Sequence, residues 1–330
     1  MKLSIVTTLY MSEHHLQEFC ERIRRVAHRI AEEDYEMIMV NDGSPDKSLE
    51  VAVALSAVYP NLRVVDLSRN FGHHQAMRAG LSHTVGERVF LIDSDLEEQP
   101  EWLEVFDREL TERECDIVIG AQAKRKGRWG ERLTGAVFWH LFSMIGSSVT
   151  IKDQTTARLM TRRFVNSLLR FTEKELFLHG VMELVGFEVS TVVVKKGMTS
   201  PSTYSLRRRV ALLLNAITSF STAPLMWALW VGALIAFIST AYALTLVYRK
   251  VMWDYVVEGW TSVMVSIWIF SGVIISLIGI VGLYIAKIFS ETKRRPSTII
   301  KDVYKDGAIL KEKSSGSRFP HYLTTDDRLP

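Results

Sequence analysis

The sequence has few cysteines and little excess charge, and each shortage excludes a class of protein. Its two cysteines, Cys20 and Cys115, lack the spacing of metal ligands and are too few for a disulfide framework. The 40 Lys and Arg residues nearly balance the 37 Asp and Glu residues, so bulk charge indicates no nucleic-acid partner. No internal repeat is visible. The composition therefore predicts neither a disulfide-bonded framework nor a nucleic-acid binder.

Two long stretches lack charged residues altogether. They cover residues 210–248 and 259–286, and each exceeds the roughly 20 apolar residues that cross a bilayer. We expect membrane-spanning helices at about 223–247 and 261–286. Arginine and lysine are more frequent outside this pair of helices than between them, which predicts that both chain termini are cytoplasmic. The basic residues outside are Arg207, Arg208, Arg209, Lys287, Lys293, Arg294 and Arg295, against Arg249 and Lys250 between the helices.

The segments around these helices are also distinctive. Residues 207–221 begin with three arginines and continue as an apolar stretch, which favours a helix lying on the lipid headgroups. The alternative is the first part of one long spanning helix, and Pro224 favours a break before the next apolar run. The N-terminus shows no secretory signal, so we expect the first part of the chain in the cytoplasm. The tail from 301 to 330 is polar, and we expect it to be poorly ordered.

The N-terminal part alternates apolar strand patterns with helical patterns. This alternation is typical of βαβ units, and it predicts an α/β fold with a mainly parallel sheet. The expected strands cover residues 3–8, 37–40, 62–67, 88–93, 116–121 and 187–194, and the expected helices cover 13–33, 47–59, 73–84 and 101–113.

Two carboxylates follow the strand expected around residues 89–92. That run of four apolar residues is typical of a buried strand, and Asp93 and Asp95 come directly after it. Ligands of open α/β sheets collect at the carboxyl ends of strands, where two such carboxylates can hold a divalent cation. The alternative is that Asp-Ser-Asp only ends the strand and caps the helix that starts near Pro100.

Polar motifs follow four strands in order. They are Thr8-Leu9-Tyr10 with Glu13, Val40-Asn41-Asp42-Gly43-Ser44, Ser68-Arg69-Asn70-Phe71-Gly72, and Asp93-Ser94-Asp95. With the membrane helices, this set resembles the inverting GT-A glycosyltransferases of family two, most of all the polyprenyl-phosphate glycosyltransferases such as bactoprenol glucosyltransferase and dolichol-phosphate mannose synthase. The resemblance covers about residues 1–290. It implies a Rossmann-like GT-A nucleotide-sugar domain at 1–205. The residue pattern adds an interfacial helix at 206–222, a two-helix membrane hairpin at 223–290 and a cytoplasmic polar tail at 291–330.

The resemblance also implies roles for single residues. Asp95 and Glu97 would hold Mg²⁺ or Mn²⁺, which neutralises charge on a departing nucleoside diphosphate. For Asp42, the residues alone favour a turn role within Asp-Gly-Ser-Pro. For His73, a metal role is the weaker alternative. The residues implied to bind the donor nucleotide are Leu9, Tyr10, Glu13, Asn41, Asp42, His73, Asp93 and Ser94.

The acceptor side departs from the family pattern. Relatives carry a general-base Asp where this chain has Thr156, which leaves Asp153, with Arg158 and Asp95, as the catalytic candidates. A phosphate-monoester acceptor, with a second pKa of about 6, is already largely dianionic and needs orientation more than deprotonation. Residues 195–204 stand where the family has a loop that closes over the donor. The cations expected at the acceptor phosphate are Lys124, Arg125 and Arg128, with solvated surface charge as the alternative.

Together these features predict a metal-dependent glycosyltransferase of the bacterial inner (cytoplasmic) membrane, with a role in cell-envelope polysaccharide. We expect it to move a hexose from a nucleotide-sugar donor, such as UDP-glucose, to polyprenyl (undecaprenyl) phosphate on the cytoplasmic leaflet, without a nucleic-acid partner. The resemblance alone suggests a homo-oligomer. Two alternatives stay open: transfer to a hydroxyl of a lipid-linked glycan or polysaccharide, and a non-catalytic nucleotide-sugar-binding membrane module, which Thr156 keeps in view.

Overall fold

The described residues of the computed structural model fall into two compact units. The α/β unit contains the described residues up to 197 together with 295–310, and the helical unit contains those from 223 to 293. The described ranges are 1–122, 154–171, 182, 185–197, 223–253, 259–293 and 295–310. Several predictions from the sequence lie outside them: Asp153, the cations Lys124, Arg125 and Arg128, and the interfacial helix at 206–222.

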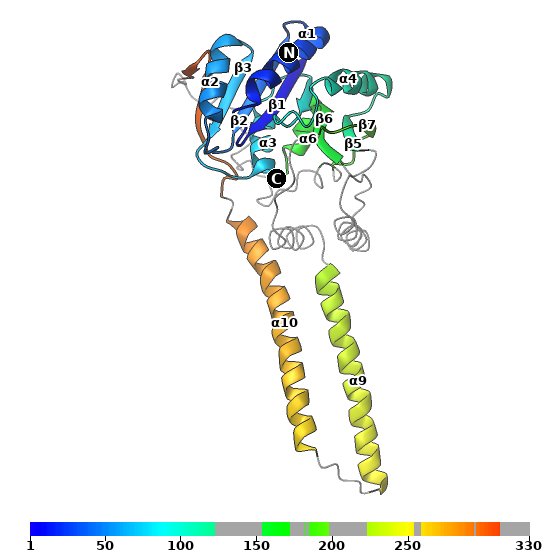
Figure 1. The fold of residues 1–330 in the computed structure, drawn as a ribbon. Coiled ribbons are helices and arrows are strands. Elements are labelled where there is room, and N and C mark those ends of the chain that lie inside the picture. Colours follow the sequence, from blue (N-terminus) through cyan, green and yellow to red (C-terminus); the bar gives the residue numbers. More distant parts are fainter. Residues whose placement is uncertain are drawn as a thin grey trace, which may run out of the picture. The chain divides into compact units, whose positions relative to one another are not determined.

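A mixed sheet of nine strands forms the centre of the α/β unit in the described ranges (Figure 1). Its spatial order is β7-β5-β6-β4-β1-β2-β3-β8-β9. Every residue of β1 and β2 is buried, as expected where helices cover both faces of a sheet. The strands are β1 (Leu3–Leu9), β2 (Tyr35–Asn41), β3 (Leu62–Leu67), β4 (Arg88–Leu91), β5 (Ile117–Gln122), β6 (Gln154–Thr161), β7 (Val189–Val194), β8 (Ile300–Lys305) and β9 (Ala308–Ile309).

Helices pack on this sheet through apolar faces visible in the sequence. In α1 the buried positions recur at helical spacing, including Phe19, Ile23 and Val26, and they join the core of the sheet. The helix expected at 13–33 is therefore confirmed with slightly narrower bounds. The described helices of the α/β unit are α1 (Leu16–Ala31), α2 (Ser48–Val58), α3 (His73–Ser82), α4 (Trp102–Glu112) and α6 (Arg162–Leu168).

Strand direction brings polar loops to one edge of the sheet. β1 pairs in parallel with β2 and β4, and β2 pairs in parallel with β3, so the carboxyl ends of four strands meet. β6 runs antiparallel between β4 and β5, with Arg158 opposite Leu91, so its first residues reach the same edge. Four of the eight described pairings are antiparallel. The expectation of a mainly parallel sheet is corrected to a mixed one.

The C-terminal segment is the second correction. The polar tail was expected to be poorly ordered, but β8 pairs with the edge strand β3 and β9 folds back on β8. Asp306 and Gly307 form the two-residue turn between them with φ values of 52° and 75°, the pattern of a tight hairpin turn. Tyr304 packs against the core, and the Gly307 N–H donates to Ser56 Oγ at 3.1 Å. Residues 300–309 therefore belong to the sheet.

The helical unit consists, in the described residues, of α9 (Ala223–Trp253) and α10 (Trp260–Thr292) (Figure 1). Large apolar side chains on both are exposed, among them Trp227, Phe237 and Ile275. Within the part of the chain that the structure describes, one stretch, Phe270–Thr292, is long and apolar enough to cross a membrane. That finding supports one of the two spans expected from the sequence.

Candidate functional site

Loops after β1, β2, β3 and β4 meet the start of β6 at the polar edge of the sheet. Leu9, the last residue of β1, and Tyr10, the residue that follows it, differ in solvent exposure. Leu9 is fully buried in the core, so the predicted contact of Leu9 with a nucleotide could come only from its backbone. The side chain of Tyr10 is 52% exposed and remains available to stack on a base or ribose.

Asp42 clamps two of these loops together. Its carboxylate accepts the N–H groups of Phe71 at 2.7 Å and Gly72 at 3.0 Å, and its carbonyl accepts the Asn70 amide at 3.0 Å. Burial raises the pKa of Asp42, although the two N–H groups act in the opposite direction. These contacts reach residues about 30 positions away, so Asp42 is more than a local turn former. Both carboxylate oxygens of Asp42 already accept a hydrogen bond from the protein. Its hydrogen bond to a nucleotide base therefore stays a prediction.

Gly43 allows this clamp to close. Its φ is +60°, and a Cβ added there would lie 2.4 Å from the backbone nitrogen of Asn70. Only glycine combines that backbone conformation with such a close approach.

Asn41 and Ser94 were expected to bind the donor, but both point into the protein. Asn41 is buried, donates to Asp66 Oδ1 at 2.7 Å and accepts the Ser44 N–H at 3.3 Å. Ser94 is also buried, and its hydroxyl donates to the Thr8 carbonyl at 3.0 Å. Their side chains therefore hold the loops in place and do not face a ligand.

Glu13 joins the loop after β1 to the loop after β2. Its carboxylate accepts the Lys47 N–H at 2.9 Å, and its own N–H donates to Asp46 at 3.3 Å. Asp46 is partly desolvated, but hydrogen bonds from Ser44, Ser48 and the Glu13 N–H lower its pKa to about 2. Glu13 is thus a loop-fixing residue at the border of the site.

Asp93 and His73 form a pair beneath the site. His73 begins α3, and its Nε2 lies 3.3 Å from Asp93 Oδ1 while its Nδ1 is 3.0 Å from Thr8 Oγ1. Burial would lower the pKa of His73, but the Asp93 carboxylate raises it overall. Burial would raise the pKa of Asp93, but His73 and the Thr156 hydroxyl keep it low. Both ring nitrogens of His73 are engaged, so a role of His73 toward a donor stays a prediction and would act through Asp93.

A single residue with a strained backbone, Leu96, separates Asp95 from Glu97. Asp95 Oδ1 accepts the Glu97 N–H at 3.0 Å, and Leu96 between them has a φ of +60°, an unusual value for a bulky side chain. Burial and the neighbouring Asp93 charge raise the pKa of Asp95. Helix α4 begins later, with Glu101 as its N-cap and no side-chain cap hydrogen bond. The helix-capping alternative for Asp-Ser-Asp is therefore wrong.

The carboxylates Asp95 and Glu97 fit a metal shared with substrate. No group of three or more His, Cys, Asp or Glu side chains that could hold a metal occurs among the described residues. Mg²⁺ is usually bound by one or two carboxylates together with substrate phosphates and water. The donor set therefore suits a cation that binds with a diphosphate, and not a preformed protein-only site.

Glu98 was not singled out from the sequence. It is fully buried, its Oε1 accepts the Thr156 N–H at 2.8 Å, and its Oε2 has no hydrogen-bond partner in the described ranges. Burial, followed by repulsion from Asp93, raises its pKa to about 7. Lys196, at the end of β7, lies 3.6 Å from Glu98 and 3.2 Å from Glu97. Its signal in the sequence was weak, since Glu98 is one of three successive polar residues, Glu97-Glu98-Gln99, that follow Asp95 and Leu96.

Arg158, one of the expected catalytic residues, is buried and supports the start of β6. It is 1% exposed, and it donates to the Thr155 carbonyl at 2.7 Å and the Thr156 carbonyl at 2.9 Å. Burial lowers its pKa to about 10, against the opposing effect of Glu98 and Asp93. A cation held in this way fixes the start of β6 and is not free to bind a phosphate.

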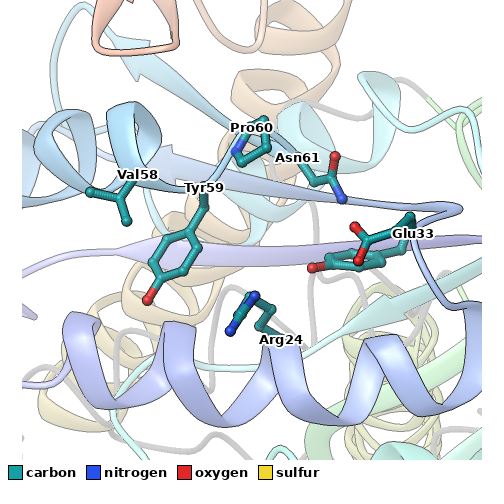
Figure 2. A pocket seen from close by; sticks show the side chains of 7 residues that line it. Arg24, Glu33, Val58, Tyr59, Pro60 and Asn61 are labelled. Carbon is teal, nitrogen blue, oxygen red and sulfur yellow. The ribbon is translucent and has the colours of Figure 1, made fainter.

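A cavity of about 400 Å³ lies elsewhere, at the amino ends of β2 and β3 (Figure 2). The guanidinium of Arg24 lies over the Tyr59 ring at 5.7 Å, and Glu33, Tyr35 and Asn61 also line the cavity. None of the residues predicted to bind the donor or the metal lines it. The candidate site is therefore the opposite, polar edge of the sheet.

Loops joined by hydrogen bonds, with carboxylates at the carboxyl ends of parallel strands, are typical of α/β enzymes that bind a nucleotide at such an edge. Residues 4–174 match the family model described as glycosyl transferase family 2. A protein of Mycobacterium tuberculosis described as putative glycosyltransferases is 43% identical over 315 residues, 96% of this chain and 92% of that protein. The chain therefore belongs to glycosyltransferase family 2, and it is a glycosyltransferase with an α/β GT-A fold.

Two further relatives match over nearly their whole length. The glycosyltransferase YkcC of Bacillus subtilis is 32% identical over 308 residues, 92% of this chain and 94% of that protein. The bactoprenol glucosyl transferase of Shigella phage SfX is 31% identical over 307 residues, 91% of this chain and 99% of that protein.

Proposed function

We propose that this glycosyltransferase moves a hexose from a UDP-sugar to polyprenyl phosphate at the cytoplasmic face of a bacterial inner membrane. The observation that carries the proposal is the match to bactoprenol glucosyl transferase over 91% of this chain and 99% of that protein. A match of that extent reaches beyond the α/β unit into α9 and α10, which hold the candidate span. The sheet and the apolar helices therefore both align with a relative whose name refers to the lipid bactoprenol.

The site residues suit a single inverting displacement. An acceptor phosphate oxygen attacks the anomeric carbon, the bond from that carbon to the diphosphate oxygen breaks, and the nucleoside diphosphate leaves with the electron pair. Asp95 and Glu97 would hold the divalent cation, which when bound stabilises negative charge on the leaving diphosphate. His73 and Thr156 fix Asp93 beneath the donor.

The position of Thr156 favours a phosphate acceptor over a hydroxyl acceptor. Its N–H donates to Glu98 and its hydroxyl contacts Asp93, where the family pattern places a carboxylate base. A lipid phosphate is already largely dianionic at neutral pH, with a second pKa of about 6, and needs no base. A sugar hydroxyl would need one.

Chain connectivity supports the membrane topology that we propose. Helix α9 has 31 residues, about 46 Å at 1.5 Å per residue, and α10 contains the candidate span. α10 ends at Thr292 and β8 begins at Ile300, so the polar segment between them is too short to recross a bilayer. We therefore propose a two-helix hairpin with both ends in the cytoplasm. Assembly into a homo-oligomer stays a prediction.

The test uses the full chain purified in detergent, with undecaprenyl phosphate, Mg²⁺ or Mn²⁺ and a panel of UDP- and GDP-sugars. Release of nucleoside diphosphate and formation of glycolipid are followed together. We expect lipid-dependent release with a UDP-hexose, reduced at least about 100-fold by Asp95→Asn and unchanged by Glu50→Gln, which removes an exposed carboxylate on α2.

Other outcomes identify the rivals. Release that requires a glycan hydroxyl instead of lipid phosphate would establish the second acceptor class. Nucleotide-sugar binding without release under any acceptor would indicate a non-catalytic module. Turnover that is insensitive to Asp95→Asn would refute the assigned site.

A further inference from the structure

Four carboxylates lie close together in the loop after β4, and in the described ranges few cationic side chains pair with them. Asp93, Asp95, Glu97 and Glu98 lie within six residues, and repulsion from Asp93 contributes to the raised pKa values of Asp95 and Glu98. In the described part of the chain, Asp93 is paired with His73, and the acids of the next turn are paired with Lys196.

Lys196 is brought to this loop by a strand from the other side of β6. It follows β7, which is separated from β4 by β5 and β6 in the sheet. The Gly197 N–H donates to the Glu97 carbonyl at 2.8 Å, so the backbone of the segment is fixed on the same residue that the Lys196 ammonium pairs with, at 3.2 Å. The contact is therefore built from two independent interactions.

The Lys196 ammonium and a divalent cation compete for one carboxylate. Glu97 is one of the two acids placed for the metal, and a doubly charged ion on it would lie within a few ångströms of the Lys196 Nζ. Like charges at that distance repel strongly in a partly buried site. Because a lysine side chain is a flexible point charge, it can withdraw while the backbone contact of Gly197 stays.

We propose that Lys196 is a resident counter-ion of the metal site: it neutralises Glu97 and Glu98 in the metal-free protein and is displaced when a divalent cation binds Asp95 and Glu97. The proposal rests on the proposed function only in requiring that cation. Displacement makes metal binding weak on its own and ties it to release of the Lys196 side chain at the end of β7.

The test measures Mn²⁺ binding to the full chain in detergent, without nucleotide, from the electron paramagnetic resonance signal of free Mn²⁺. Lys196→Met should bind Mn²⁺ at least about tenfold more tightly than wild type, because the competing charge is gone. Lys195→Met is the matched control, since it removes the same charge from the exposed neighbouring residue. Without metal, Lys196→Met should also unfold at a lower temperature than Lys195→Met, and saturating Mn²⁺ should close that gap.

A second measurement uses the unmodified chain. Acetylation by an amine-selective reagent, read by mass spectrometry, should modify Lys196 faster in saturating Mg²⁺ than in EDTA, while Lys195 reacts at the same rate in both. Equal or weaker Mn²⁺ binding by Lys196→Met, or unchanged acetylation of Lys196, overturns the proposal. Neither readout needs sugar or lipid, so its failure is distinct from failure of the proposed transfer.

Discussion

Gly43 and Gly72 both adopt positive φ in the donor loops, but only Gly43 is crowded. A Cβ at Gly43 would meet the Asn70 nitrogen at 2.4 Å, whereas a Cβ at Gly72 would meet nothing within 4 Å. The pair therefore separates steric clash from backbone strain, and it tests whether the contact between the loops after β2 and β3 matters for donor binding.

We expect Gly43→Ala to weaken UDP binding at least about tenfold and to destabilise the fold by about 1–3 kcal/mol, because the loop that Asp42 clamps must move. Gly72→Ala should show the strain alone, about 1–3 kcal/mol, because its φ of 97° and ψ of 146° lie close to a region that is essentially restricted to glycine. Calorimetric titration with UDP and thermal unfolding measure the two effects. Equal losses of UDP affinity in both variants would show that the close approach at Gly43 is unimportant.

At the scale of single residues, the sequence predicted where the site lies but did not predict the role of each side chain. Asp42, Asp93 and Asp95 do gather at one edge, as strand-end placement predicts. Asn41 and Ser94 sit in the same motifs, yet they turn inward because their partners, Asp66 and the Thr8 carbonyl, are 25 and 86 residues away. A pattern of residue types along the chain carries no information on such distant partners. Lys196 was overlooked as a partner of Glu97 for the same reason.

Among the elements, strand β8 departs most from the sequence expectation. The charged residues of Ile300–Lys305 made the segment resemble a tail, although Ile300, Val303 and Tyr304 suit an edge strand. The Asp306-Gly307 turn was the strongest hairpin signal in that region. β6 was missed as well, since Arg158 interrupts its apolar pattern. The burial of Arg158 is compensated in part by hydrogen bonds to the carbonyl groups of the same strand.

Removing β8 and β9 should destabilise the α/β unit. A chain that ends at Ser297 loses the ladder to β3 and the packing of Tyr304, so we expect thermal unfolding at least about 4 °C lower. A chain that ends at Leu310 keeps both strands and serves as the matched control. Scanning calorimetry in detergent measures both, and equal unfolding temperatures would mean that the added strands contribute no stability.

At the scale of the whole molecule, the proposed hairpin predicts where each part meets solvent. We expect the native cysteines to react little with a maleimide, because burial raises the pKa of Cys20 to about 12 and also raises that of Cys115. Val256→Cys, between α9 and α10, should react with a membrane-impermeant maleimide in intact cells. Glu50→Cys, on α2, should react only after lysis. Labelling of Glu50→Cys in intact cells would show that the topology is the reverse of the proposed one. If neither variant is labelled in intact cells, the segment between α9 and α10 lies in the cytoplasm and the hairpin is refuted.

The order of the chain has a consequence for synthesis. β3 is made early, but its partner β8 follows α10, so the ribosome must complete both long apolar helices before this edge of the sheet can close. Until then β3 carries unpaired backbone groups, a surface on which nascent chains associate wrongly. Asp66, which holds Asn41 beneath the donor loop, receives Lys301 from β8 at 3.7 Å at the same late step. The donor side of the sheet is thus completed only after both long helices have been synthesised, and in the proposed topology the helices would enter the membrane before the enzyme becomes fully active.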